Sequence, residues 1–187
     1  MKKVGLFGGT FDPPHKGHLK LSQTVLNTLN LDEIWFIPTF NPPHKKGAVA
    51  TPEQRLTMLN KLLEDDQRLK VSTIEYELKG KSYTYETVKR LCKEYPNTMF
   101  YFIIGGDMVE YLPKWYKIEE LKRLIQFVGV NRKGHHAVNQ RGVLMVNMDE
   151  VPVSSSEIRK DIKEGRLPQG LTESVLHYIR ENELYED

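Results

Sequence analysis

The sequence predicts an α/β fold in which residues 1–187 form a single domain around one doubly wound, largely parallel sheet. Two observations support this prediction. Short apolar runs rich in β-branched residues recur along the chain, and segments with helical periodicity alternate with most of them. Because the runs are continuously apolar, we expect strands covered on both faces, and right-handed βα crossovers then make the sheet parallel.

The first half of the chain alternates strand and helix patterns. The apolar run 4–7 predicts the first strand, and the helix after it is predicted by helical spacing at Leu19, Ser22, Val25, Leu26 and Leu29. The runs 34–37 and 71–74 predict the second and third strands, with a helix near 53–63 between them. The stretch 39–52 holds Pro, Gly, Lys and His without periodicity and is expected to contain a loop.

The second half repeats the alternation and then ends in helices. A helix carrying Val88, Leu91 and Cys92 precedes a predicted strand at 99–104. A helix near 117–125 leads to the strands predicted by the last two apolar runs, 127–130 and 143–146, with a loop expected at 131–142. Helical spacing then predicts two final helices, near 155–163 and 172–182.

Composition excludes several classes of protein. The 27 Lys and Arg residues against 25 Asp and Glu give a net charge of +2, too balanced for nucleic acid or a membrane surface to be the main partner. No window approaches the roughly 20 apolar residues of a membrane-spanning helix, and the basic start lacks the apolar stretch of a signal peptide. The single cysteine, Cys92, excludes an intramolecular disulfide and a cysteine-rich zinc site, so we expect a cytoplasmic protein.

Polar clusters follow nearly every predicted strand, at or soon after its carboxyl end. They occupy residues 8–15, 38–46, 105–107, 131–134 and 152–156. In an open parallel sheet these ends lie along one edge, where ligands bind at the point at which the strand order reverses. The sequence therefore predicts that glycines, histidines and cations from distant parts of the chain converge on one cleft.

The first cluster contains the groups that a phosphate-binding site needs. Gly8 and Gly9 leave bare backbone open to a ligand, and His15 and His18, three residues apart, can face the same side of a helix entrance. The alternative is a tight turn followed by helix caps. P-loop and dinucleotide-binding fingerprints are absent, and the two histidines lack the further ligands of a zinc site, so no protein metal site is predicted.

Other motifs allow both a structural and a functional interpretation. Ser154 and Glu157 form a capping box, while the hydroxyls beside Ser154 and the cation of Arg159 are suited to hold an anion. Asp107 either accepts bonds from a ribose or caps the next helix. Trp115 and Tyr116 either form a platform on which a flat heterocycle stacks or belong to the hydrophobic core. Residues 82–85 open a helix and can be its cap alone, and the charge run 44–46 can be a solvated surface.

Two segments, GGTFDPPHKGH at 8–18 and VSSSEIR at 153–159, resemble nucleotidyltransferases of the HxGH superfamily. Further segments at 37–45, 82–84 and 112–116 narrow the resemblance to bacterial nicotinate-mononucleotide adenylyltransferases, over essentially the whole chain. Gly106 and Val153 depart slightly from the family pattern. The loop at 131–142 has its own basic sequence, which puts adenine contacts there in doubt.

The resemblance implies a Rossmann-like nucleotidyltransferase that moves AMP from ATP to nicotinate mononucleotide, giving nicotinate adenine dinucleotide and pyrophosphate for NAD biosynthesis. It implies catalytic roles for His15, His18 and Arg159. It implies ATP contacts from Gly8, Gly9, Thr10, Phe11, His15, His18, Gly105, Asp107, Ser155, Ser156 and Arg159. It implies nicotinate mononucleotide contacts from His44, Lys45, Thr84, Trp115 and Tyr116. Mg²⁺ would arrive on the ATP, and a homo-oligomer is compatible with the sequence.

Three alternatives compete with this interpretation. Another adenylyl- or cytidylyltransferase of the same fold, such as the phosphopantetheine enzyme, is disfavoured by the chain length and by the segment around Trp115. A regulatory module would bind ATP without releasing pyrophosphate. A nucleic-acid-binding protein would use the basic patches at 44–46 and 131–142 and would be retained on a nucleic-acid column in a salt-dependent way.

Overall fold

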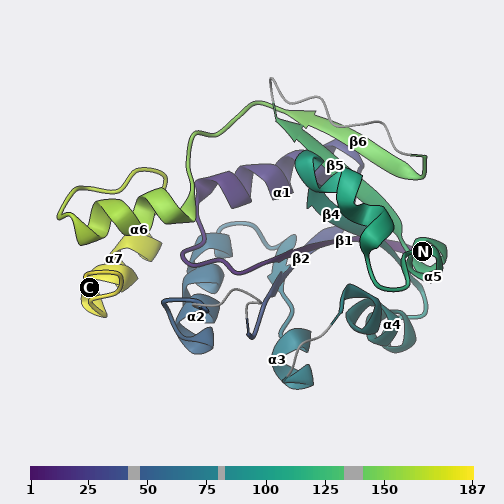
Figure 1. Ribbon diagram of the computed structural model, residues 1–187, viewed down its shortest axis with the longest axis horizontal. Helices are drawn as coiled ribbons and strands as arrows, with labels where there is room; N and C mark the ends of the chain where they lie inside the picture. The colour runs from purple at the N-terminus through teal and green to yellow at the C-terminus, as the bar shows by residue number, and fades with distance from the viewer. Residues whose placement is uncertain (42–46, 80–82, 133–140) are drawn as a thin grey trace.

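The computed structural model describes residues 1–41, 47–79, 83–132 and 141–187 (Figure 1). All of its strands join one parallel sheet in the order β3-β2-β1-β4-β5-β6. The strands are β1 (Lys2–Gly9), β2 (Glu33–Pro38), β3 (Leu69–Val71), β4 (Thr98–Gly105), β5 (Gln126–Arg132) and β6 (Val143–Met148). The order reverses between β1 and β4, so the predicted doubly wound parallel architecture is confirmed, with its switch point between these two strands.

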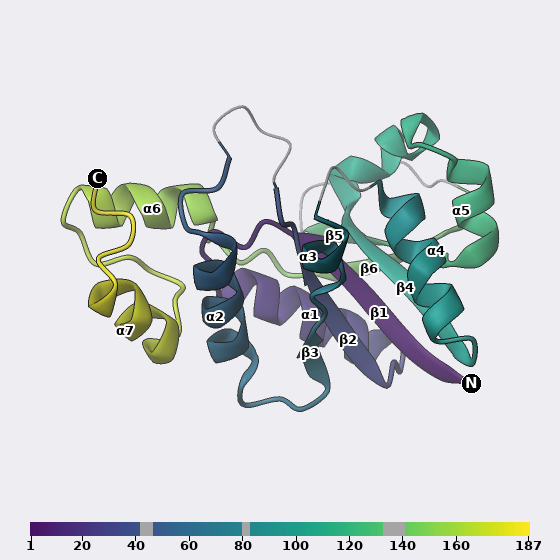
Figure 2. The same cartoon turned by 90° about the horizontal axis from the view of Figure 1, so that it is seen from below.

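Helices cover both faces of the sheet. One face packs against α1 (Lys16–Thr28), α2 (Pro52–Leu63), α6 (Ser155–Lys163) and α7 (Glu173–Glu181). The other packs against α3 (Ile74–Leu78), α4 (Thr84–Glu94), the 3-10 helix η1 (Gly106–Lys114) and α5 (Ile118–Leu124). Figure 2 shows α6 and α7 together at one end of the molecule and α4 and α5 at the other. No helix in the described ranges is long and apolar enough to cross a bilayer.

The central strands send alternate side chains into two separate cores. In β2, Ile34 and Phe36 belong to the core beneath α1 and α2, whereas Trp35 and Ile37 point to the core beneath α3 and α4. Both faces are therefore apolar, which explains why the strand sequence is a continuous hydrophobic run without polar alternation. The prediction of double coverage is confirmed.

The prediction for the third strand was wrong at its boundaries. It placed the strand at 71–74, whereas β3 pairs with β2 from Leu69 to Val71. The chain leaves the sheet after Ser72, whose N–H donates to the Phe36 carbonyl, and Thr73 then caps α3, where Ile74 is already helical. Ile74 is apolar because it is buried beneath the helix, and periodicity alone does not separate that role from a strand residue.

Candidate active site

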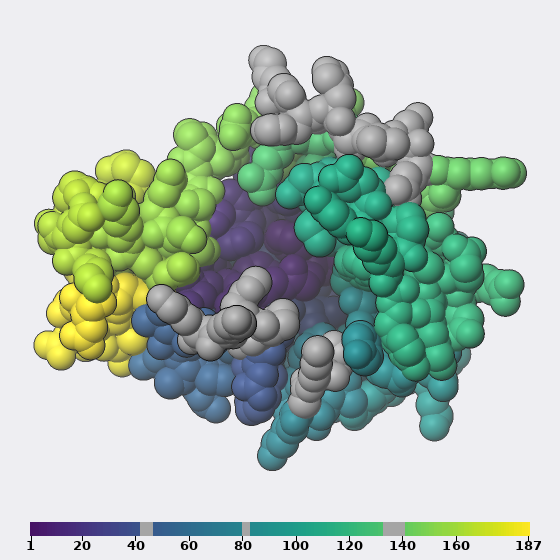
Figure 3. Space-filling view, viewed as in Figure 1, coloured from purple at the N-terminus to yellow at the C-terminus, as the bar shows by residue number. Residues whose placement is uncertain are grey.

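A cleft of about 300 Å³ opens at the carboxyl ends of β1 and β4. Figure 3 shows its setting, with purple N-terminal atoms recessed between the yellow-green atoms of the C-terminal helices and the teal-green atoms around η1. The cleft is lined by Phe7, Gly8, Gly9, Phe11, His15, Gly17, His18, Leu21, Gly105, Arg132, Met148, Val151, Val153, Ser154 and Ser155. Residues from β1, β4, β5 and the start of α6 thus meet here, as the clustering at strand ends predicts.

The two histidines of the cleft interlock at the start of α1. His15 is the N-cap residue, and its Nδ1 accepts the N–H of Gly17 at 3.0 Å. The Nδ1 of His18 accepts the N–H of His15 at 3.1 Å, which completes a capping box made of imidazoles. The two rings stack with their centroids 3.7 Å apart. Each histidine therefore fixes the orientation of the other.

This arrangement sets the protonation state of both rings. A ring nitrogen that accepts an N–H carries no proton, so in each neutral ring the proton sits on Nε2 and is free to be donated to a ligand. Burial first, and then the Arg132 guanidinium, lower the pKa of His15 to about 4. Burial, His15 and Arg132 lower the pKa of His18 well below 6.5. Both rings are therefore neutral N–H donors at pH 7.

Backbone of the first loop forms the floor of the cleft. Phe11 adopts a left-handed conformation with φ of 52°, and its ring is buried. This ring lies against Gly9, where an added Cβ would come within 3.0 Å of it, and it meets the His18 ring edge to face at 5.0 Å. Gly9 is therefore required for close packing. At Gly8 an added Cβ would have its nearest neighbours at 3.9 and 4.0 Å, so that position stays open toward the cleft.

The start of α6 forms a second helix N-terminus at the cleft. Ser154 is its N-cap, as predicted, and its hydroxyl accepts the N–H of Glu157 at 3.2 Å. Ser155 donates to the Pro13 carbonyl at 2.8 Å. Arg159 donates to the Asp12 carbonyl at 2.7 Å. Two helix N-termini, with their partial positive charge, are thus held side by side.

Arg132 belongs to the cluster 131–134 that the sequence places at the cleft, but the sequence interpretation gave this residue no role of its own. It is the last residue of β5, lines the histidine cleft, and also lines a neighbouring cleft of about 170 Å³. That second cleft contains Asp107, whose carboxylate lies against Gly105, together with Gly106, Val130, Asn131 and Glu150. The predicted strand ended at residue 130, so Arg132 was assigned to the following loop, whereas β5 continues to Arg132 and holds this cation at the edge of the sheet.

The predicted aromatic residues divide between two environments. The Trp115 ring meets Phe102 and Phe127 edge to face, each at 5.9 Å, and Phe102 in turn lies close to Gly8 of the cleft. The exposed Tyr116 ring packs instead on Tyr83 and Tyr85, at 4.7 Å and 6.1 Å, and these two tyrosines are the chain neighbours of Thr84 at the start of α4.

Among the predicted ATP contacts, Thr10, Ser156 and Arg159 line neither cleft. Thr10 is absent from the cleft lining, and its carbonyl accepts a bond from Arg55 at 2.9 Å. Ser156 is exposed and lies 3.4 Å from Arg159. His44 and Lys45 lie outside the described residues, as does Ser82.

Arg55 is a residue that the sequence interpretation missed. It is fully buried in α2, and its guanidinium donates to four carbonyls, those of Thr10, Thr39, Phe40 and Ala50. These carbonyls belong to the segments that follow β1 and β2 and to the one that enters α2. A single side chain therefore holds together the loops behind the histidine cleft, and only the tertiary fold reveals this.

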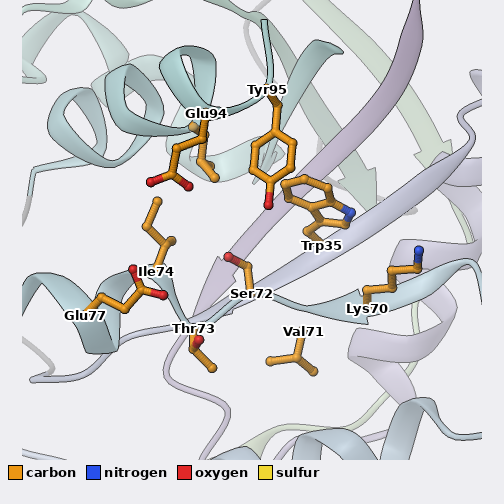
Figure 4. Close-up of a pocket in the computed structure, with 10 residues that line it drawn as sticks. Trp35, Lys70, Val71, Ser72, Thr73, Ile74, Glu77, Glu94 and Tyr95 are labelled. Carbon is orange, nitrogen blue, oxygen red and sulfur yellow. The ribbon is translucent and has the colours of Figure 1, made fainter. Parts of the chain in front are cut away.

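A third pocket, of about 310 Å³, shares no lining residue with the histidine cleft. Figure 4 shows Trp35 and Tyr95 on one side of it and Glu77, Ile74 and Thr73 on the other. It lies between α3 and α4, over the edge of the sheet. Its carboxylates Glu77 and Glu94 both pair with Arg90, so this pocket does not gather unpaired catalytic groups.

The walls of the histidine cleft present hydrogen-bond donors. These are the imidazole Nε2–H groups, the Arg132 guanidinium and the first backbone N–H groups of α6, whereas the N–H groups of residues 15–18 at the start of α1 are already bonded within the protein. Donors of this kind fit phosphate oxygens and do not fit a metal ion. Within the described ranges, no group of three or more His, Cys, Asp or Glu side chains is placed to hold a metal.

Comparisons with known proteins agree with this geometry. Residues 6–161 match the family described as cytidylyltransferase-like. The chain is 46% identical to the nicotinate-nucleotide adenylyltransferase of Bacillus subtilis (strain 168) and 48% identical to a Bacillus cytotoxicus relative, each over 100% of both chains. A Plasmodium falciparum nicotinic acid mononucleotide adenylyltransferase complexed with NaAD has the same fold, with a TM-score of 0.83 over 100% of this chain and 98% of that one at 20% identity.

Proposed function

Because the chain belongs to the nicotinate-nucleotide adenylyltransferase family, we propose that it transfers AMP from ATP to nicotinate mononucleotide and releases pyrophosphate. The observation that best supports this is the interlocked pair His15 and His18 between two helix N-termini, with Arg132 opposite. A polyphosphate is the ligand that neutral N–H donors, a guanidinium and two positive dipole ends bind together.

The chemistry needs alignment and charge stabilisation and no covalent enzyme intermediate. An oxygen of the mononucleotide phosphate attacks the α-phosphorus of ATP, and the bond from that phosphorus to the bridging oxygen of pyrophosphate breaks. The Nε2–H groups of His15 and His18 are assigned to phosphate oxygens on which charge develops, together with Arg159. A phosphate at cellular pH is already ionised, so no general base is assigned.

The remaining ATP contacts follow from the same cleft. Gly8, Gly9 and Phe11 are assigned to the floor beneath the nucleotide, and Ser155 and Ser156 to its β- and γ-phosphates at the start of α6. The main chain of Thr10 is kept as a contact although its carbonyl is already bonded to Arg55. Gly105, which lines the histidine cleft, and Asp107, which lines the second cleft beside Arg132, are assigned to the adenosine part.

The acceptor is assigned to the α4 side of the cleft. Crossover helices run antiparallel to the strands, so the N-terminus of α4 lies at the same edge of the sheet as the histidines. Its first N–H groups and the hydroxyl of Thr84, whose two chain neighbours pack on Tyr116, suit the carboxylate of a nicotinate ring, and Trp115 is assigned to the ring itself. His44 and Lys45 are assigned to the mononucleotide phosphate.

Mg²⁺ is assigned to the nucleotide and not to a protein site. The residues that line the cleft are donors, so they do not fit a dedicated magnesium site, and no step is derived through the ion. The single cysteine supports a cytoplasmic location for the reaction.

The test is pyrophosphate release with ATP and Mg²⁺, run in parallel with nicotinate mononucleotide, nicotinamide mononucleotide and phosphopantetheine. We expect release that strongly favours nicotinate mononucleotide. ATP binding without pyrophosphate release from any of the three would instead support a different acceptor or a nucleotide-binding regulatory module.

A further inference from the structure

Asp12 is a buried carboxylate in the loop that carries the histidines, and it does not line the cleft. It is 5% exposed and accepts three hydrogen bonds. Two come from the backbone before α2, from Val49 N–H at 2.8 Å and Ala50 N–H at 3.1 Å. The third comes from the Tyr185 hydroxyl at 2.7 Å. These three donors hold the buried Asp12 carboxylate in place. If one of them is removed, the buried charge of the carboxylate loses part of its compensation.

The main chain at the same point holds the start of α6. The Asp12 carbonyl accepts from Arg159 Nη1, and the next residue, Pro13, accepts from Ser155. The side chain and the carbonyl of Asp12 thus connect two different parts of the fold. A shift of Asp12 therefore moves the guanidinium of Arg159 as well as the loop that leads to His15.

Tyr185 reaches this point from 173 residues away in sequence. It follows α7, is 6% exposed, and adopts a left-handed conformation with φ of 68°, as Glu183 does with φ of 52°. Such backbone is unfavourable for residues with a Cβ, so packing and the bond to Asp12 must hold it. Burial and then the Asp12 carboxylate raise the pKa of Tyr185, which keeps its hydroxyl a donor, and Arg159 is near enough to act on it electrostatically in the opposite direction.

We propose that Tyr185 is a positioning residue for the phosphate-binding groups: its hydroxyl fixes Asp12, and Asp12 fixes Arg159 and the histidine loop. The predicted effect of Tyr185 on kcat rests on the proposed function. The positioning of Arg159 by Tyr185 does not depend on which reaction is catalysed. The hydroxyl acts through Asp12 and does not itself touch the cleft.

The experiment uses Tyr185→Phe in the full chain, which removes one oxygen and keeps the ring. The matched control is Tyr76→Phe, which removes a half-buried hydroxyl that donates to the Pro52 carbonyl at 2.6 Å. We expect Tyr185→Phe to lower kcat about tenfold with little change in the KM for ATP, while the control keeps wild-type kcat. We also expect the NMR resonance of the Arg159 side-chain Nε–H to shift in Tyr185→Phe and not in the control.

A double-mutant cycle of Tyr185→Phe with Arg159→Ala distinguishes an effect on the position of Arg159 from a general loss of stability. If Tyr185 acts through Arg159, the double variant loses less activity than the product of the two single effects. Fully multiplicative effects, or an unshifted Arg159 resonance, would overturn the proposal. Should Tyr185→Phe fail to fold, Asp12→Asn tests the same link by the same resonance. A wild-type protein that releases no pyrophosphate, with the resonance shift still present, would refute the proposed function and leave the positioning intact.

Discussion

The rings of His15 and His18 lie 3.7 Å apart and are tilted by 26°, and the Nδ1 of His18 accepts the backbone N–H of His15. Both Nδ1 atoms are therefore occupied within the helix cap, and both Nε2–H groups remain for a ligand. A role in the helix cap therefore does not exclude the proposed contact with a phosphate, and the two interpretations of this motif are compatible.

Replacing His18 with alanine should mainly slow the chemical step. Loss of one donor to the charge that develops in the transition state costs about 2–4 kcal/mol, or about 30- to 900-fold in kcat. Steady-state kinetics with ATP and nicotinate mononucleotide provides the measurement. His177→Ala is the control, because His177 lies on α7 and pairs with Glu181 at the surface. An unchanged kcat with only a raised KM for ATP would remove His18 from the catalytic role.

The sequence predicts the local parts of this site well. Gly8, Gly9, His15 and His18 lie within eleven consecutive residues, so their juxtaposition follows from one strand, one turn and one helix start. The parallel, doubly wound character of the sheet also follows, because βα repetition and apolar runs restrict the sheet to a few topologies, but the strand order itself comes from the structure. The prediction of helix 155–163 coincides with α6, where the Ser154 cap is a local signal.

The buried polar connections could not be predicted in this way. Arg55 looks like one charged residue in an amphipathic helix, yet it is fully buried against four carbonyls. The bond between Asp12 and Tyr185 joins positions that no local pattern relates. Such contacts depend on how the C-terminal helices dock, and the sequence contains no periodic signal for that docking.

The lowered pKa of His15 makes stability depend on pH. The ring stays neutral in the folded protein down to a pH of about 4, whereas the unfolded chain binds a proton below about 6.5. The unfolded state therefore binds more protons in this window, and the free energy of unfolding falls as the pH falls from 6.5 to about 4, by about 3 kcal/mol. Urea unfolding at several pH values measures this loss.

The variant His15→Asn provides the comparison for that measurement. Asparagine is a good N-cap residue but does not titrate, so the variant should lose part of the slope between pH 6.5 and 4. An identical slope in the variant would show that the pH dependence comes from His18 and the carboxylates and not from His15.

Gly8→Ala should separate folding from ligand binding. The nearest atoms to an added Cβ are 3.9 and 4.0 Å away, which is ordinary contact, so the melting temperature should stay close to that of the wild type. The new methyl group occupies backbone that the nucleotide is proposed to approach, so we expect the KM for ATP to rise about tenfold, equivalent to about 1.4 kcal/mol. A lower melting temperature with an unchanged KM would contradict this assignment.

Arg55→Met should destabilise the whole fold. The substitution keeps an apolar stem of similar length but leaves four carbonyls without their donor, and hydrogen bonds to charged groups are worth about 1.5–3 kcal/mol each. Because the loops can relax and water can enter, we expect a total loss above about 3 kcal/mol. Denaturant unfolding measures it, with Arg68→Met as the control, since Arg68 is exposed and pairs with the nearby Asp66. Equal stabilities of the two variants would contradict the role assigned to Arg55.

Arg132→Gln should raise the pKa of both histidines. The Arg132 guanidinium disfavours a second positive charge nearby, and its removal leaves burial as the largest cause of the lowered pKa of each ring. The pKa values should therefore rise but stay below 6.5, which can be followed through the imidazole resonances by NMR and assigned with His15→Asn and His18→Ala. Arg166→Gln is the control. Arg166 follows α6, forms bonds with Asp161 and Glu164, and is not among the charges that lower the pKa of either ring. Unchanged histidine pKa values in Arg132→Gln would mean that burial alone keeps the pair neutral and that Arg132 serves the ligand only.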